Sequence, residues 1–521
     1  MALRKSDSIG DITGYIGKNF NEVVGIVTGN PKEKIHFKGL KVDLFSERTG
    51  GPLSTFLTGH AKYVLSNNGF KEEIETVPFF VKHYQKKDRK LPRGFLDFAG
   101  QQFEFDAESY NFCSDFPYVP DLYSAMPGGR ILILEFINGR LLEQHLESRT
   151  KKSERVGLVK DILEDVVSRF HIDVRDKMVA LYGDGTGEYN RLREHISKKE
   201  YREEKALKRN GESQESIQRT ITLRKAYGYL RAIKGLDSTA ELREIDSNLL
   251  ERFIKSYWPV SLSYDRTEPE DQLSHGNLTA SNIIISDNGE EKYFIIDPKI
   301  KFRQPIIDVA ELISSEGMEL QPSDWGMLVE SYWRSCARRV LGDDPEATIR
   351  HPLKPLEIIL QLIYGIFGKP EIRLEAAKKS LGVFYRGIIH ESLKKIAKDR
   401  DTERYFPEIY NDWMETRPCF RTSIYQMTTN IKNALDALIS KPEQYDVSLG
   451  RAKEKEEQEL QAFVELRKIL FDEGWTEPED LKYKLKEKHY RKIFQNNPPN
   501  PGTFNSGIEA KSESSQELRT V

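Results

Sequence analysis

The spacing of apolar residues changes near residue 138, and this change constrains the fold more than any other feature of the sequence. Before it, apolar and β-branched residues occur in short runs separated by turn-forming clusters, which predicts strands. After it, apolar residues recur three or four positions apart, as in ERVGLVKDILEDVVSRF, which predicts amphipathic helices. We therefore predict an α+β chain in which a strand-rich part is followed by a mainly helical part.

The strand-rich part contains four runs that read as strands and one that reads as a helix. The helix is QQFEFDAESYNFCSDF, residues 101–116. The strands are KIHFKGLKVDLF, STFLTGHAKYVL, ETVPFFVKHYQKK and GRILILEFI. A strand-rich part with one helix is the expected result.

Charge and composition divide the chain further. Lys, Arg and Glu alternate densely within the segment 172–270, which predicts an exposed charged insertion rather than a basic binding patch. The end of the chain is polar and rich in Pro, Gly and Ser, which predicts disorder. The predicted segments are an N-terminal segment 1–34, a strand-rich part 35–137, a helical part 138–450, C-terminal helices 451–494 and a disordered tail 495–521.

The composition excludes several classes of function. Charged residues make up 31% of the chain, its net charge is -3 and its pI is about 6.4, which argues against a dedicated nucleic-acid surface. The three cysteines show no metal-ligand or disulfide pattern, so a reducing cytoplasm is expected. The start lacks the apolar core of a signal peptide, and the longest apolar stretch, residues 356–368, is too short to span a membrane. The expected partner is a small molecule or a protein, without nucleic acid or membrane.

The segment NIIISDNGEEKYFIIDP predicts a β-hairpin with polar residues at its base. Two apolar runs are joined by a connection that contains Asp-Asn-Gly, a strong hairpin signal. Antiparallel pairing would bring Asn282, at the start of the first strand, next to Asp297, at the end of the second. An amide oxygen and a carboxylate at one edge suit Mg²⁺ that also binds nucleotide phosphates. We therefore predict that Asn282 and Asp297 are metal ligands.

HGNLTASNIII followed by FIIDPK resembles the catalytic loop and metal-binding aspartate of the protein-kinase-like superfamily, most closely its aminoglycoside-phosphotransferase and choline-kinase branch. That branch typically shows His-Gly-Asp-Leu-x-x-x-x-Asn. His275, Gly276, Leu278 and Asn282 agree with the pattern, whereas Asn277 stands where the branch has aspartate. The resemblance implies a bilobal fold with a small antiparallel N-lobe carrying one helix, and a large helical C-lobe with an insertion and a C-terminal extension. It also implies ATP and Mg²⁺ as cofactors.

The resemblance assigns roles to residues in other segments. Lys82, in the strand FFVKHY, would contact nucleotide phosphates and pair with a glutamate of the helix at 101–116. Glu108 is the first choice for this partner and Glu104, one turn earlier, is the alternative. Asp308, in RQPIIDVAELI, would brace the catalytic loop, and His275 would support the loop by packing rather than act as a catalyst.

Two further segments would contact the nucleotide under the same resemblance. In ERTGGPLST, Gly50 and Gly51 would let backbone amides approach the phosphates. In ILILEFINGRLL, backbone groups of Glu135, Phe136 and Ile137 would hydrogen-bond the adenine before the chain enters the helical part.

Asn277 leaves the function open. With Lys82 and Asp297 it completes the predicted catalytic set, but an amide cannot accept the proton of an incoming hydroxyl. Phosphoryl transfer depends mainly on positioning and charge stabilisation, so transfer without a base is physically possible.

Three hypotheses on function remain. The chain is an ATP- and Mg²⁺-dependent phosphotransferase for a small-molecule acceptor, in which a carboxylate such as Asp271 substitutes or the acceptor is already ionised. Alternatively it is a pseudokinase that binds nucleotide, or keeps only the fold, and acts as a protein-interaction module. The third hypothesis is nucleotidyl transfer.

Overall fold

The structure is a computed structural model of the whole chain, which divides into two units, residues 1–474 and 475–521. All the residues that it describes belong to the first unit. They are residues 12–14, 16–17, 35–44, 54–67, 70–75, 78–84, 98–148, 151–183, 187, 228–230, 247–265, 273–287, 292–315, 317–341, 371–405, 407–416, 423–440 and 453–472.

The strand-rich part forms an antiparallel sheet of six strands. Its strands are, in order, β1 (Ile35–Leu44), β2 (Ser54–Asn67), β4 (Phe79–Tyr84), β6 (Ile131–Glu135) and β5 (Leu122–Met126), and β3 (Phe70–Glu75) pairs with β2. The four predicted strands are confirmed as β1, β2, β4 and β6. The sequence did not reveal β3 and β5, since FKEEIE and LYSAM lack the apolar alternation typical of strands.

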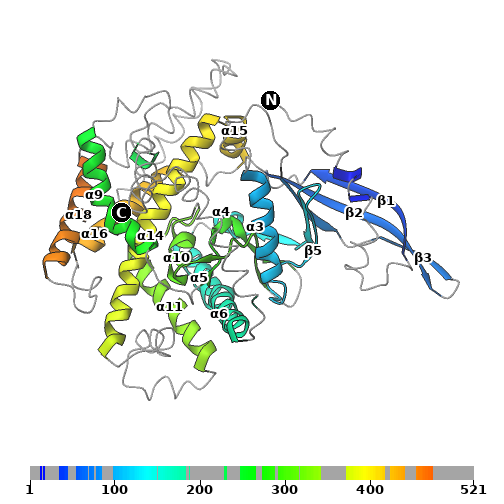
Figure 1. The fold of residues 1–521 in the computed structure, drawn as a ribbon, viewed down its shortest axis with the longest axis horizontal. Coiled ribbons are helices and arrows are strands. Elements are labelled where there is room, and N and C mark those ends of the chain that lie inside the picture. The colour runs from blue at the N-terminus through cyan, green and yellow to red at the C-terminus, as the bar shows by residue number, and fades with distance from the viewer. Residues whose placement is uncertain are drawn as a thin grey trace, which may run out of the picture. The chain divides into compact units, whose positions relative to one another are not determined.

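One helix, α3 (Phe98–Phe112), lies beside this sheet and contacts β4, β5 and β6 (Figure 1). The predicted helix at 101–116 is therefore confirmed, with both ends three to four residues earlier than expected. The buried residues of α3 include Phe103, Asp106 and Tyr110, which recur three or four positions apart and so lie on one face. This face is turned toward the sheet.

A second sheet joins the two parts of the chain. It has the order β10-β9-β7, with β7 (Gly139–Leu141) following β6 after three residues and with β9 (Ile283–Ser286) and β10 (Tyr293–Ile295) forming the predicted hairpin. Gly139 is required where β7 meets β9, because a Cβ at this position would lie 2.3 Å from the Ile285 carbonyl oxygen. The connection out of the large sheet is thus tied by backbone pairing to the hairpin.

The remaining described elements are mainly helical, so small antiparallel sheets and a helical majority together make up the α+β chain. The predicted stripe in ERVGLVKDILEDVVSRF is confirmed as a continuous helical run with one π-turn. The helices are α4 (Leu142–Ser148), α5 (Lys152–Ile162), η3 (Leu163–Val167), α6 (Ser168–Gly183), α9 (Ser247–Asp265), η5 (Ala280–Asn282), α10 (Pro305–Ile313), α11 (Pro322–Leu341), α14 (Glu371–Tyr405), α15 (Pro407–Thr416), α16 (Ser423–Ser440), α18 (Lys453–Arg467) and η7 (Lys468–Asp472), and two short strands, β8 (Leu273–Ser274) and β11 (Lys301–Phe302), pair with each other.

Some predictions concern residues outside the described ranges and stay predictions. They include the phosphate loop at Gly50 and Gly51, the substitute base Asp271, the apolar segment 356–368 and the tail 495–521. Within the described residues, no helix is long and apolar enough to cross a membrane.

Candidate functional site

Lys82 lies where β4, α3 and the hairpin meet. It is the fourth residue of β4 and only 6% exposed. Its Nζ lies 2.8 Å from Asp106 Oδ2 and 2.5 Å from Asp297 Oδ1. Burial alone would lower the pKa of this ammonium, but the attraction of Asp106 and Asp297 raises it above its ordinary value. Lys82 is therefore a protonated, buried cation between two carboxylates.

The helix partner of this lysine is Asp106, which corrects the prediction of Glu108 with Glu104 as the alternative. Asp106 is fully buried, whereas both glutamates are exposed. Phe103 and Tyr110, three and four positions away, share the buried face with Asp106, and the two glutamates lie on the other face. The apolar pattern of the helix carried this signal, but the sequence prediction followed the expected residue type, glutamate, instead.

Asp106 accepts hydrogen bonds from several side chains. Gln102 Nε2 lies 2.5 Å from Oδ1, and the Tyr84 hydroxyl donates to Oδ2. Burial, with the nearby charge of Asp106, raises the pKa of Tyr84 well above its ordinary value, so the hydroxyl keeps its proton and donates. A fourth donor is the ammonium of Lys299, which contacts Oδ1. A buried carboxylate needs such a complete set of donors.

Asp297, two residues after the end of β10, adopts an unusual backbone conformation. Its φ of 56° lies in the left-handed region, and the following residue is Pro298, which restricts it further. Its N–H donates to the Tyr110 hydroxyl at 2.9 Å. Burial would raise the pKa of its carboxyl, but Lys299 and Lys82 hold that pKa well below its ordinary value. Strain of this kind is concentrated at functional sites, which makes Asp297 a candidate functional residue.

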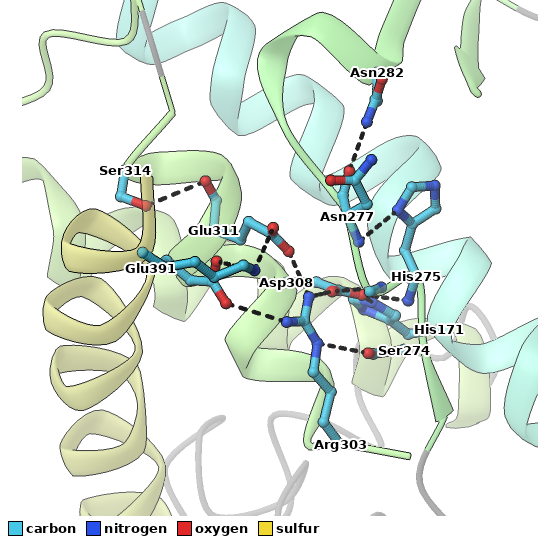
Figure 2. A network of polar contacts seen from close by, with 12 residues as sticks. His171, Ser274, His275, Asn277, Asn282, Arg303, Asp308, Glu311, Ser314 and Glu391 are labelled. Carbon is cyan, nitrogen blue, oxygen red and sulfur yellow. Dashed lines mark hydrogen bonds and ion pairs between the residues drawn. The ribbon is translucent and has the colours of Figure 1, made fainter. Parts of the chain in front are cut away.

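The loop at 275–277 is held by the carboxylate of Asp308 (Figure 2). The N–H groups of His275 and Gly276 donate to Asp308 at 2.5 and 3.1 Å. Gly276 has a φ of 77°, and a Cβ there would lie 2.0 Å from the Lys299 carbonyl oxygen, so only glycine fits. The side-chain amide of Asn277 donates to Asp297 Oδ2 at 3.2 Å. Asn277 therefore faces the site and presents a donor there.

His275 is buried and neutral. Burial lowers the pKa of its imidazole to about 4. Its Nδ1 lies 3.3 Å from the N–H of Asn277 and its Nε2 3.2 Å from the Ile296 carbonyl oxygen, so Nδ1 accepts and Nε2 donates. These contacts place the ring between the loop and the hairpin, as a supporting side chain.

A buried ionic network surrounds Asp308 (Figure 2). His171 Nε2 lies 2.9 Å from Asp308, and the guanidinium of Arg303 contacts Asp308 and lies 2.5 Å from Glu311 and 3.3 Å from Glu391. Burial would raise the pKa of Asp308, but Arg303 and His171 keep it below its ordinary value. Sequence reasoning missed His171 and Glu391, which lie far along the chain from their partners Asp308 and Arg303. It also missed Arg303, because its spacing of five residues from Asp308 matches no helix or strand pattern.

Asn282 and Asp297 lie at one edge of the hairpin, as the predicted metal site requires. The Ile296 N–H donates to the Asn282 carbonyl oxygen at 2.9 Å, and the Asn282 side-chain nitrogen donates to the Asn277 carbonyl oxygen at 2.8 Å. Asp297, however, already accepts two ammonium groups on Oδ1 and an amide on Oδ2. Two lysines also balance the two aspartates in formal charge. In this arrangement the side chains do not fit a divalent cation, and among the described residues no group of three or more His, Cys, Asp or Glu could hold a metal.

The predicted adenine-binding segment follows directly on the central strand β6. The Glu135 N–H donates to the Asp121 carbonyl oxygen at 2.9 Å, and Phe136 and Ile137 leave the sheet partly buried. This places the segment at the junction of the large sheet and β7.

Comparisons with known proteins give structural similarity only. No protein-family model matches the chain, and no curated protein matches it. Among solved structures, it is similar to a Plasmodium vivax ethanolamine kinase, with 11% identity, a TM-score of 0.31 and coverage of 77% of this chain and 88% of that one. It is also similar to choline kinase LicA from Streptococcus pneumoniae, with 12% identity, a TM-score of 0.32 and coverage of 81% and 99%. A third similar structure is a complex of gentamicin with APH(2")-IIa, with 13% identity, a TM-score of 0.32 and coverage of 66% of this chain and 90% of that one. At these TM-scores, we draw conclusions about function from the geometry of the site alone.

Proposed function

We propose that this chain binds ATP between the two lobes of a protein-kinase-like fold and transfers the terminal phosphate to a small-molecule acceptor. The observation that carries this proposal is the buried contact of Lys82 with Asp106 and Asp297. A buried ion pair adds little to stability compared with apolar packing, so a cluster drawn from three distant segments favours a functional role. The large sheet would be the nucleotide-binding lobe and the helical part the acceptor-binding lobe.

In this proposal the two lysines provide the charge that the phosphates need. Lys82 and Lys299 both contact Asp297 Oδ1, so their ammonium groups converge on one place. Cations fixed in advance at a transferring phosphoryl group stabilise the charge that it carries in the transition state. Backbone groups of Glu135, Phe136 and Ile137 would receive the adenine, and Gly50 and Gly51 would contact the phosphates.

Asn277 determines what kind of transfer is possible. Its amide donates to Asp297, and it cannot take a proton from the acceptor. Loss of general-base assistance lowers a rate by ~10²- to 10⁴-fold, so the proposed reaction is slow unless the acceptor is already ionised. The same observation favours a second candidate, a pseudokinase that binds nucleotide without turnover and contacts a protein partner through its helical part.

The remaining features of the proposal follow from composition and from the cysteines. Cys113 and Cys336 are buried free thiols, and the net charge of -3 argues against a dedicated nucleic-acid surface. We therefore propose a cytoplasmic protein that acts on a small molecule and binds neither nucleic acid nor membrane.

Titration calorimetry with ATP tests the nucleotide site. Lys82→Met removes the central ammonium and should weaken ATP binding by about tenfold or more, the effect of one lost charge-assisted hydrogen bond. Lys292→Met is the matched control, since Lys292 is an exposed lysine beside β10. Equal affinity in the two variants, or no binding of ATP by the wild type, would refute the proposed nucleotide site.

Phosphate release measured with a panel of small hydroxyl and amine compounds then separates the two candidates. A compound that stimulates ATP consumption identifies a phosphotransferase. ATP binding without consumption across the panel identifies the pseudokinase.

A further inference from the structure

Lys299 is a second, largely buried lysine at the site, and the sequence prediction gave it no role. It lies two residues after Asp297, and its side chain is 12% exposed. Its Nζ lies 2.9 Å from Asp297 Oδ1 and also contacts Asp106 Oδ1. Lys82 and Lys299 thus bridge the same two carboxylates.

The backbone of Lys299 is fixed on two sides. Its N–H donates to the His275 carbonyl oxygen at 2.7 Å, and its own carbonyl oxygen packs against Gly276. The next residue, Ile300, donates its N–H to the Ser109 hydroxyl of α3 at 3.3 Å. The loop and α3 hold the backbone on either side of Lys299. The fold therefore determines the position of the ammonium group, unlike that of a lysine on a freely moving surface side chain.

This placement uses the carboxylate positions that a divalent cation would need. Mg²⁺ takes oxygen ligands at about 2.0–2.1 Å, and the anionic ligand at this edge is Asp297. Oδ1 of Asp297 is shared by two ammonium groups, and Oδ2 accepts the amide of Asn277. A metal ion on Oδ1 would therefore lie against two cations.

The formal charges lead to the same conclusion. Lys82 alone with Asp106 and Asp297 would leave one negative charge to attract a divalent cation. Lys299 cancels that charge, so the four side chains together are neutral. An ammonium can also stabilise phosphate oxygens directly, as a compact cation with three donors.

We propose that Lys299 is a built-in cation at the phosphate end of the site, in the place of a divalent metal, so that this chain binds ATP without one. The inference rests on the proposed nucleotide site and concerns the charge that balances the phosphates there. Lys299 would be a binding residue that contacts the phosphates together with Lys82.

The first test measures the Kd of the wild-type chain for ATP in excess EDTA and in excess MgCl₂. The proposal expects the two values to agree within about threefold, well below the effect of one lost charge-assisted hydrogen bond. Binding that is more than tenfold weaker in EDTA would overturn it, while the nucleotide site itself would stand. Absence of binding under both conditions would refute the nucleotide site and this inference together.

The second test uses Lys299→Met, with Lys299→Arg to retain the charge and Lys292→Met as an exposed control. Lys299→Met should lose about tenfold or more in ATP affinity in EDTA and recover most of it in MgCl₂, because Asp297 then carries an uncompensated charge. Lys299→Arg, which keeps the charge, should lose less affinity in EDTA than Lys299→Met, and Lys292→Met should resemble the wild type. A Lys299→Met chain that is equally affected with and without Mg²⁺ would contradict the metal-replacing role. If this variant does not fold, as judged from its circular dichroism and thermal melting, the comparison of EDTA and MgCl₂ on the wild type decides alone.

Discussion

Replacement of Asp106 by asparagine is a direct test of how the site is held together. The substitution keeps the size but only one accepting oxygen, so the hydrogen bond from either Gln102, on Oδ1, or Tyr84, on Oδ2, can persist, and the other donor meets an amide NH₂ group. It removes one negative charge, after which Lys82 and Lys299 share Asp297 alone and the cluster carries one net positive charge. Breaking one side of a buried ion pair costs ~3–5 kcal/mol. Because Asp297 remains as a partner, we expect the lower end, a loss of about 3 kcal/mol in the free energy of unfolding.

The measurement is a urea titration at pH 7 followed by circular dichroism, which gives the free energy of unfolding of each variant. Glu108→Gln is the control, since Glu108 is an exposed carboxylate on the same helix and its substitution should change the free energy by less than ~0.5 kcal/mol. A loss of less than about 1 kcal/mol for Asp106→Asn would refute the reasoning, because buried lysines cannot lose a required counter-charge at so small a cost. Equal losses for the two variants would refute the assignment of Asp106 in place of Glu108.

Two further predictions concern the loop. Burial lowers the pKa of His275 to about 4, whereas the unfolded chain has a pKa of about 6.5, so unfolding takes up a proton between these two values. The free energy of unfolding is therefore highest above pH 6.5 and falls by about 2 kcal/mol by pH 5. In a pH series of urea titrations, His275→Gln should make the free energy of unfolding depend less on pH between 4 and 6.5. An unchanged dependence on pH would contradict a neutral buried imidazole. Asn277→Asp supplies a proton acceptor beside Asp297, so phosphate transfer to a stimulating acceptor should rise by ~10²-fold or more. An unchanged rate would show that a missing base does not limit the reaction.

Local patterns were sufficient for much of the fold. The strand lysine, the hairpin and the helical stripe were predicted correctly, because alternation and 3.6-residue spacing depend on which side of an element is buried. The hairpin also determined that Asn282 and Asp297 lie at the same edge, since antiparallel pairing of two neighbouring strands leaves little freedom. Strands β3 and β5 were missed, because their residues have little strand character and pairing with β2 and β6 holds them in place.

The identity of the residues that contact one another across segments was harder to predict. Asp106 was overlooked in favour of two exposed glutamates, although its spacing from Phe103 and Tyr110 marked it as buried. His171 shows no local signal, because its partner Asp308 becomes a neighbour only when α6 and α10 pack together. Arg303 lies five residues before Asp308, just outside β11, at a spacing that belongs to no helix or strand pattern. Helix and strand periodicities describe faces, and they contain no information on which two faces meet.

The sequence by itself determined that this chain has a strand-rich part and a helical part, a loop with asparagine in place of aspartate, and a hairpin that ends in a carboxylate. Only the tertiary structure decided how that carboxylate is neutralised. Lys299 follows Asp297 by two residues, and nothing in the sequence shows where its ammonium lies. Its position depends on Gly276, which admits the Lys299 carbonyl group, and on Asp106, which approaches from α3. Electrostatic balance at a buried site is set by distances of a few ångströms between segments far apart in the chain, and these distances exist only once the segments have packed.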